Sequence, residues 1–198
     1  YARHAPLNYK TLYDAEEKPL AIMVPAWQEH GVIGQMAQLA ATTLDYENYH
    51  IFIGTYPNDP QTHADVEQVR ARFPNVHTVV CARPGPTSKA DCLNNVVVAI
   101  LPFEKRSGVR FAGFILHDAE DVLSKLELRL FNYLVNRKDL IQLPVYPLER
   151  PWNDFTGGHY LDEFAELPGK DIVVREALVG QVPSAGVGTC FSRRAIMA

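Results

Sequence analysis

The chain has 198 residues, of which 47% are hydrophobic and 21% are charged, with a net charge of -4 and a pI near 6.0. This length suits a single domain with a full hydrophobic core, and the composition excludes disordered, fibrous and disulfide-stapled classes. The small negative charge argues against a nucleic-acid-binding surface, so we expect no nucleic-acid partner.

Short apolar segments alternate with helical patterns after a lead-in segment over residues 1–18. We predict strands at 20–26, 49–55, 75–80 and 111–117, and a strand with a weaker pattern at 140–146. We predict helices at 31–44, 63–72, 89–101 and 125–136. Capping boxes are expected to open the last three, formed by Thr62 with Asp65, Ser88 with Asp91, and Ser124 with Glu127. This alternation predicts an α/β fold, with a mostly parallel central sheet flanked by helices on both faces.

Residue usage also bears on the cellular setting. Cys81, Cys92 and Cys190 form no C-x-x-C pair, which predicts neither a zinc ribbon nor a disulfide framework and fits a reducing compartment. No apolar run reaches the ~18 residues of a membrane span, and no signal peptide opens the chain, so this piece is expected to be soluble. The chain starts at Tyr1 and a helix is expected to begin within FSRRAIMA (191–198), so we expect it to be part of a longer protein.

The polar segments that follow the predicted strands are the candidates for a binding site, because parallel α/β sheets bind ligands beyond the carboxyl ends of their strands. These segments are PAWQEH, TYPND, CARPGPTSKADCLN and HDAED. The last contains Asp118, Glu120 and Asp121, whose like charges repel unless a cation lies among them. The other segments add an aromatic residue, Trp27, and a lysine, Lys89. Together these residues predict a nucleotide-diphosphate site in which the carboxylates hold a divalent metal, Mg or Mn.

Each of these residues also has a plainer interpretation. An acidic turn after a strand is often only solvated, and Asp121 could serve as a negative charge ahead of the next helix. Lys89, in the first turn of a helix, is unfavourably placed unless an anion is nearby, but it could be an ordinary solvated lysine. Trp27 taken alone suits an aromatic residue at the edge of the core.

Several other chemistries are excluded because the sequence motifs that they require are absent or incomplete. PSAGVGTCF (183–191) has Phe191 where a dinucleotide fingerprint needs its last glycine, so NAD binding is rejected. The sequence contains no P-loop and no G-x-S-x-G elbow. None of the seven histidines has a metal-ligand spacing, so each is expected at the surface or in the core.

Four motifs occur in the order and approximate spacing seen in family 2 glycosyltransferases of the GT-A fold: IMVPAWQE, SKADCLN, ILHDAEDV and VPSAGVGTCFSRRA. The chain resembles this family over residues 20–195, and it is most similar to the branch of inner-membrane glycosyltransferases of a bacteriophage adsorption receptor. The resemblance implies one GT-A domain over 1–198, truncated at its C-terminal end. It further implies metal-dependent inverting transfer of a sugar, with N-acetylhexosamine as the family-based choice, from a UDP-sugar to a glycan acceptor.

The resemblance also implies a setting, in cell-surface polysaccharide synthesis or phage-receptor function. A longer membrane protein would hold this domain at the cytoplasmic face of the inner membrane, where membrane partner proteins could join it.

The resemblance assigns the nucleotide-binding residues by motif. PAWQE matches the segment that contacts the base and ribose, which implies Ala26, Trp27 and Glu29. SKADCLN matches a stretch near the base and diphosphate, which implies Lys89 and, beside it, Asp91 and Asn94.

The DAE segment takes the place of the family's D-x-D motif. Asp118 is therefore implied to reach the ribose or the metal, and Glu120 to ligate the metal, so these two are the implied catalytic and metal-binding pair. Asp121 has no fixed role in the pattern.

The chain departs from the family pattern in two places. Thr55 and Tyr56 stand where many relatives carry the acids that read the base, which leaves Asn58 or Asp59 as substitutes. The T-E-D-like motif that supplies the general base is absent, so the base is expected beyond Ala198. We therefore expect this chain to bind its donor weakly and to turn over little.

Residues 146–170 form a long predicted loop rich in proline, glycine, aromatic and acidic residues. Its aromatic faces suit sugar rings, so we predict the acceptor side here, with Trp152 and Tyr160. The alternative is that these aromatic side chains only fold the loop onto the domain.

Two other functions fit the same fold. A sugar nucleotidyltransferase would share the sheet and metal site, but it should carry a glycine-rich basic loop after the first strand, which PAWQEHG lacks. A catalytically idle nucleotide-binding or receptor module would keep only the fold, and metal-dependent UDP binding would distinguish it from an enzyme.

Overall fold

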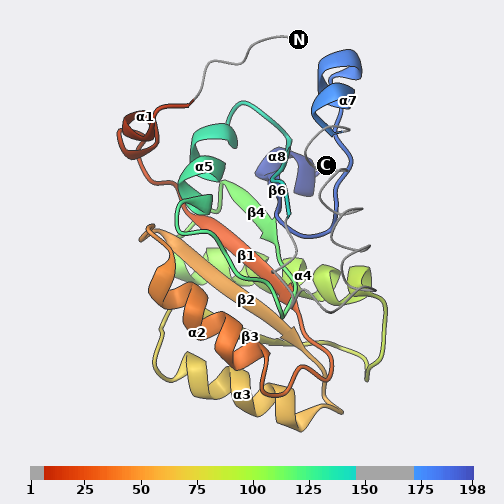
Figure 1. The fold of residues 1–198 in the computed structure, drawn as a ribbon. Helices are drawn as coiled ribbons and strands as arrows, with labels where there is room; N and C mark the ends of the chain where they lie inside the picture. Colours follow the sequence, from red (N-terminus) through yellow and green to blue (C-terminus); the bar gives the residue numbers. More distant parts are fainter. Residues whose placement is uncertain (1–6, 146–171) are drawn as a thin grey trace, which may run out of the picture.

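The computed structural model of the chain describes residues 7–145 and 172–198. Within these residues a six-stranded sheet has the order β3-β2-β1-β4-β6-β5 (Figure 1). The strands are β1 (Leu20–Pro25), β2 (Tyr49–Thr55), β3 (Val76–Val80), β4 (Gly113–Leu116), β5 (Leu140–Gln142) and β6 (Thr189–Ser192). β1 to β4 pair in parallel, and β6 runs antiparallel to both β4 and β5. The predicted mostly parallel α/β sheet is confirmed.

Helices cover both faces of the sheet (Figure 1). They are α1 (Tyr9–Tyr13), α2 (Ile33–Thr43), α3 (Pro60–Arg70), α4 (Lys89–Ser107), α5 (Glu127–Leu134), α7 (Ile172–Val179) and α8 (Arg193–Ile196). Buried residues of α2, α3 and α5 share one hydrophobic cluster, whereas Val96 and Ile100 of α4 belong to a second cluster on the opposite face. Of the helices described, none is both long and apolar enough to cross a membrane.

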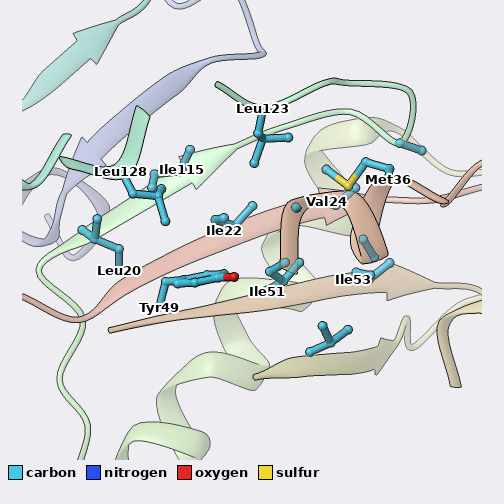
Figure 2. Close-up of a cluster of buried hydrophobic side chains, with 14 of the residues drawn as sticks. Leu20, Ile22, Val24, Met36, Tyr49, Ile51, Ile53, Ile115, Leu123 and Leu128 are labelled. Carbon is cyan, nitrogen blue, oxygen red and sulfur yellow. The ribbon is translucent and has the colours of Figure 1, made fainter. Parts of the chain in front are cut away.

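The core explains why β1 is apolar along its whole length. Leu20, Ile22 and Val24 point to the same face as neighbouring side chains of β2 and β4 (Figure 2). Ala21 and Met23 point to the other face, toward α4. All five are at most 1% exposed, so a strand in this central position must be apolar at every residue.

The Ser88 cap predicted for α4 is confirmed, because the Ser88 hydroxyl accepts a hydrogen bond from the Asp91 N–H at 3.1 Å. The reciprocal half of the predicted capping box is not formed, since the Asp91 carboxylate pairs with Arg83 instead. The helix itself is longer than predicted. It continues through Pro102 and ends at Ser107, and Gly108 follows with the left-handed φ of +74° typical of a helix C-terminus.

The caps predicted for α3 and α5 are wrong. Asp59, followed by Pro60 at the first position, caps α3 and accepts the Thr62 N–H, so Thr62 lies inside the helix. The helix α5 begins at Glu127 without a side-chain cap, and Ser124 contributes only its backbone carbonyl, which accepts the Glu127 N–H.

Three described elements were not predicted: α1 within the 1–18 lead-in, α7, and β6. The helix expected within FSRRAIMA is confirmed as α8, which Ser192 caps through the Ala195 N–H. The predicted loop at 146–170, with its candidate acceptor residues, lies outside the described residues.

Candidate functional site

The segments that follow β1 to β4 meet at the carboxyl edge of the sheet because these strands run parallel. Residues 182–188 reach the same edge by another route. β6 runs antiparallel to β4, with Thr189 paired to Leu116, so the residues before β6 lie beyond the end of β4. The Gly188 N–H extends this pairing by donating to the Leu116 carbonyl at 2.9 Å.

An aromatic platform, formed by Trp27, Tyr56 and Gly85, lies where β1 and β2 end. The rings of Trp27 and Tyr56 meet edge to face, with centroids 5.2 Å apart. The Tyr56 hydroxyl is hydrogen-bonded to the Thr87 hydroxyl at 2.8 Å, which ties the platform to the segment after β3. A Cβ on Gly85 would approach the indole carbons of Trp27 to 2.4 Å, so only glycine leaves room for this ring.

The residues that follow β2 hold this platform in place. The side-chain amide of Asn58 accepts the Gly85 N–H and donates to the Gly85 carbonyl, both at 2.7 Å. Asp59 is buried, and its carboxylate accepts the Gln28 N–H at 2.6 Å as well as the N–H of Thr62. Of the two predicted substitutes for the base-reading acid, Asp59 is thus engaged by backbone amides, while Asn58 bridges two loops beside the platform.

Glu29 faces the acidic turn after β4 from the turn after β1. Its backbone N–H donates to the Thr62 hydroxyl at 3.0 Å, which anchors this turn to α3. Burial raises the pKa of the Glu29 carboxyl, and the negative charges of Glu120, Asp118 and Asp59 raise it further. Carboxylates from two loops therefore share one electrostatic environment, which a bound cation would relieve.

Lys89 places a positive charge against these acids. Its Nζ lies 2.5 Å from Asp118 Oδ1 and donates to the Gly186 carbonyl at 3.1 Å. One side chain therefore joins the start of α4, the turn after β4 and the segment before β6. The carboxylate of Asp118 also accounts for a lysine in the first turn of a helix, where the helix dipole alone would disfavour it.

The turn Asp118–Asp121 carries the two carboxylates predicted to bind metal. The Asp121 N–H donates to the Asp118 carbonyl at 3.2 Å and closes the turn. The Asp121 carboxylate accepts the Asp118 N–H at 2.9 Å and fixes the turn from within. The side chains of Asp118 and Glu120 remain accessible, so the residue without an assigned role shapes the turn while the other two face solvent.

Asp121 also contacts His117, the residue just after β4. The Nδ1 of His117 lies 2.9 Å from Asp121 Oδ2, and its Nε2 lies 2.5 Å from Glu127 Oε1. Burial alone would lower the pKa of His117, but the hydrogen bonds and charges of the two carboxylates outweigh burial and raise it to about 9. His117 is therefore a buried imidazolium between two carboxylates at neutral pH.

The donor set fits a divalent cation that arrives with a ligand. Over residues 7–145 and 172–198, no three His, Cys, Asp or Glu side chains converge closely enough to hold a metal by themselves. Asp118 and Glu120 supply carboxylate oxygens, and Mg²⁺ at phosphate sites is commonly held by one or two protein carboxylates together with phosphate oxygens and water. The pair suits that arrangement and does not suit a structural metal site.

The remaining predicted residues have other surroundings. Ala26 is 1% exposed, so its side chain belongs to the core. Asp91 pairs with Arg83 at 2.5 Å, and this guanidinium lowers the pKa of the Asp91 carboxyl. Asn94 is exposed on α4. The residues predicted for the acceptor side lie outside the described ranges: Trp152 and Tyr160.

Three residues of this edge were not predicted for the site: Tyr56, His117 and Glu127. Part of the signal lay in the sequence, since His117 and Asp121 flank a tight acidic turn and Glu127 follows in the first turn of the next helix. The inward orientation of Glu127 depends on how α5 packs, and that packing involves strands far apart in the sequence.

Comparisons with known proteins agree with this architecture. Residues 18–198 match the family described as Glycosyltransferase like family 2. The chain is 73% identical over 198 residues to Bacteriophage adsorption protein B of Escherichia coli (strain K12) and to Bacteriophage N4 adsorption protein B of Escherichia coli O157:H7. Each alignment covers 100% of this chain and 27% of the relative, so the chain spans only about a quarter of these relatives.

Solved structures share the fold at low sequence identity. Glucosyl-3-phosphoglycerate synthase from Mycobacterium tuberculosis, in complex with Mn²⁺ and UDP-glucose, has a TM-score of 0.55 and 15% identity, covering 96% of this chain and 62% of that one. The complex of the same enzyme with UDP has a TM-score of 0.54 and 13% identity, covering 96% and 63%. The predicted GT-A architecture is confirmed, and at these identities the likeness concerns the fold alone.

Proposed function

Because the chain belongs to the glycosyltransferase like family 2, we propose that it uses a UDP-sugar and a divalent cation to transfer a sugar, with inversion, to a glycan acceptor. One observation carries the proposal: the aromatic platform, Lys89 and the carboxylates of Glu29, Asp118 and Glu120 meet at one edge of the sheet. A flat aromatic face suits a nucleobase, an ammonium suits phosphate, and two solvent-accessible carboxylates suit a cation. For the sugar, the family-based choice stays N-acetylhexosamine.

In this proposal the base packs on Trp27, and Glu29 accepts hydrogen bonds from the ribose hydroxyls. Lys89 stands ready for the diphosphate because its amine is already held at the edge of the site, 2.5 Å from Asp118. When the donor binds, the Lys89 amine would contact the diphosphate oxygens in place of Asp118. The Asp118 carboxylate would then be available to the cation that accompanies the donor.

Asp118 and Glu120 would hold the cation, which when bound neutralises charge on the departing diphosphate. Lys89 adds a fixed positive charge on the same side, and such preorganised charge is worth most where negative charge develops. The attacking acceptor hydroxyl must lose its proton to a positioned base. We propose that this base comes from beyond Ala198 and that Trp152 and Tyr160 line the acceptor side.

Calorimetry of UDP binding with and without Mn²⁺ tests the proposal. The wild-type chain is expected to bind UDP more tightly when Mn²⁺ is present, and the double variant Asp118→Ala, Glu120→Ala is expected to lose that gain. A matched control, Asp14→Ala with Glu16→Ala, removes two exposed carboxylates near α1 without touching the site. Equal UDP affinity of the wild-type chain with and without Mn²⁺ would contradict the proposal and favour the idle module.

For the whole protein we propose a role at the cytoplasmic face of the inner membrane, where the domain would glycosylate a cell-surface glycan that supports phage adsorption together with membrane partners. The support is 73% identity to proteins named for bacteriophage adsorption. Phage adsorption should fall in cells whose full-length protein carries Asp118→Ala and Glu120→Ala. Normal adsorption by such cells would separate the receptor role from sugar transfer.

A further inference from the structure

A chain of three side chains links the helix α5 to the turn Asp118–Asp121. Glu127, in the first turn of α5, contacts His117 Nε2 at 2.5 Å, and His117 Nδ1 contacts Asp121 at 2.9 Å. The oxygen of Asp121 that faces His117 is also the one that accepts the Asp118 N–H. The side chains of His117 and Glu127 are 5% and 7% exposed, so water has little access to the first link of this chain.

The chemistry of the contacts sets the form of the histidine. An ionised carboxylate only accepts hydrogen bonds, so each ring nitrogen of His117 must carry a proton to satisfy its partner. A neutral ring would leave one carboxylate opposite a nitrogen lone pair. The charged ring therefore holds Asp121 and Glu127 together, and replacing it would leave one buried and one partly buried carboxylate without their counter-charge.

Stability alone does not account for this arrangement. A buried ionic group is often no more stable than apolar residues of the same volume, and the preceding residue, Leu116, is such an apolar residue at the end of the same strand. The ionic chain lies directly beneath the turn that presents Asp118 and Glu120. Outer contacts of this kind commonly orient the side chains that bind a metal.

We propose that His117 is a positioning residue, which holds the turn Asp118–Asp121 through Asp121 in the shape that a cation bound with the donor diphosphate requires. The inference rests on the proposed function, because it concerns the cation that the donor brings. It assigns His117 no contact with substrate, and Glu127 serves as its anchor on α5. The largest consequence is expected in metal-dependent binding, since the aromatic platform is held by the Tyr56–Thr87 hydrogen bond outside the turn. Lys89, which pairs with Asp118 of the turn, also keeps its contact with the Gly186 carbonyl.

The test measures UDP affinity with and without Mn²⁺ in four chains: wild type, His117→Gln, Asp121→Ala and the double variant. Each single variant is expected to lower the metal-dependent gain in affinity by about 10- to 100-fold, the usual loss when an outer partner of a metal ligand is removed. UDP affinity without metal should fall by less than this, because Lys89 keeps its contact with the Gly186 carbonyl. Because His117 acts through Asp121, the double variant should lose no more than the more severely affected single variant.

The matched control is His77→Gln, which replaces a partly buried histidine far from the turn and should leave both affinities unchanged. Circular dichroism reports whether each variant is folded. If His117→Gln does not fold, Asp121→Ala decides, because Asp121 is 20% exposed and its replacement leaves His117 its Glu127 partner. A folded Asp121→Ala chain with an undiminished metal-dependent gain would overturn the inference, and so would additive losses in the double variant. A wild-type chain without any such gain would instead overturn the proposed function.

Discussion

Histidines pack against both ends of the sheet, in opposite surroundings. At the amino end, His50 and His77 are the second residues of β2 and β3 and are joined by a 2.8 Å hydrogen bond. Aromatic rings surround them: Phe52, Phe103 and Phe111. Burial lowers the pKa of both rings, and the repulsion that would arise if both rings were protonated helps to bring that of His77 to about 4. Both are therefore neutral at pH 7.

At the carboxyl end, His117 is more deeply buried and yet charged. Burial opposes the charge, but Asp121 and Glu127 outweigh it and raise the pKa of His117 to about 9. The surroundings, not the residue type, therefore decide whether a histidine of this sheet carries charge. The amino end is a packing surface, whereas the carboxyl end maintains charges of both signs beside the candidate site.

Replacing each histidine by leucine should show the contrast between the two ends most clearly. His117→Leu leaves Asp121 and Glu127 without their counter-charge, and we expect it to lower the free energy of unfolding by about 3–5 kcal/mol. His77→Leu loses one hydrogen bond in an apolar cluster, and we expect about 1 kcal/mol. Urea denaturation at pH 7 measures both, and equal losses would contradict the contrast between the two ends.

Alkaline pH should lower the free energy of unfolding through His117 at the carboxyl end, and not through the histidines of the amino end. The folded pKa of His117, about 9, lies above the unfolded value of 6.5, so its stabilisation is complete below pH 6.5 and is lost as pH rises through 9. The shift corresponds to about 3 kcal/mol. Urea midpoints from pH 6 to pH 10 should show this decline in the wild type, and His117→Gln should lack it. The same decline in His117→Gln would assign it to other groups.

Acidic pH should lower the free energy of unfolding through His77 at the amino end. The folded pKa of His77, about 4, lies below the unfolded value, so its neutral form stabilises the fold above pH 6.5 and this contribution is lost as pH falls toward 4. Partial exposure to solvent reduces the effect to about 2 kcal/mol or less. His77→Phe keeps an aromatic ring that cannot titrate, so its stability should change less between pH 7 and pH 4.5. An unchanged pH dependence in His77→Phe would remove His77 from this account.

The smallest effect on stability is expected for Lys89, the exposed cation of the carboxyl end. Its pair with Asp118 is open to water, so Lys89→Met should change the free energy of unfolding by less than about 1 kcal/mol. If Lys89 binds the diphosphate as proposed, UDP affinity should nevertheless fall by about tenfold, because that charged hydrogen bond is lost. Calorimetry and urea denaturation of the same sample separate the two effects. A large loss of stability would place Lys89 with His117 as a structural cation.

Sequence patterns predicted the first two thirds of the sheet closely, because β1 to β4 are apolar runs between amphipathic helices. β6 escaped prediction since four residues, two of them Thr189 and Ser192, make a weak pattern, and its pairing with β4 is a long-range property. The cap at Asp59 was missed although Pro60 follows it, a common start of a helix.

The place of the candidate site could be predicted from the rule that ligands bind at the carboxyl edge, which brings Trp27, Glu29, Lys89 and Asp118 to one side. Their mutual contacts could not be predicted. The ion pair between Lys89 and Asp118 depends on where α4 starts relative to the end of β4. The contact of His117 with Glu127 depends on the packing of α5 against the sheet.

The late position of β6 in the chain has a consequence for synthesis on the ribosome. β4 is paired with β1 on one side only until β6 arrives about 70 residues later, which takes several seconds at the usual ~5–20 residues per second. During that interval the open edge of β4 is a template for pairing with another nascent chain. The slow arrival of this strand therefore makes premature release or truncation before Thr189 a route to aggregation.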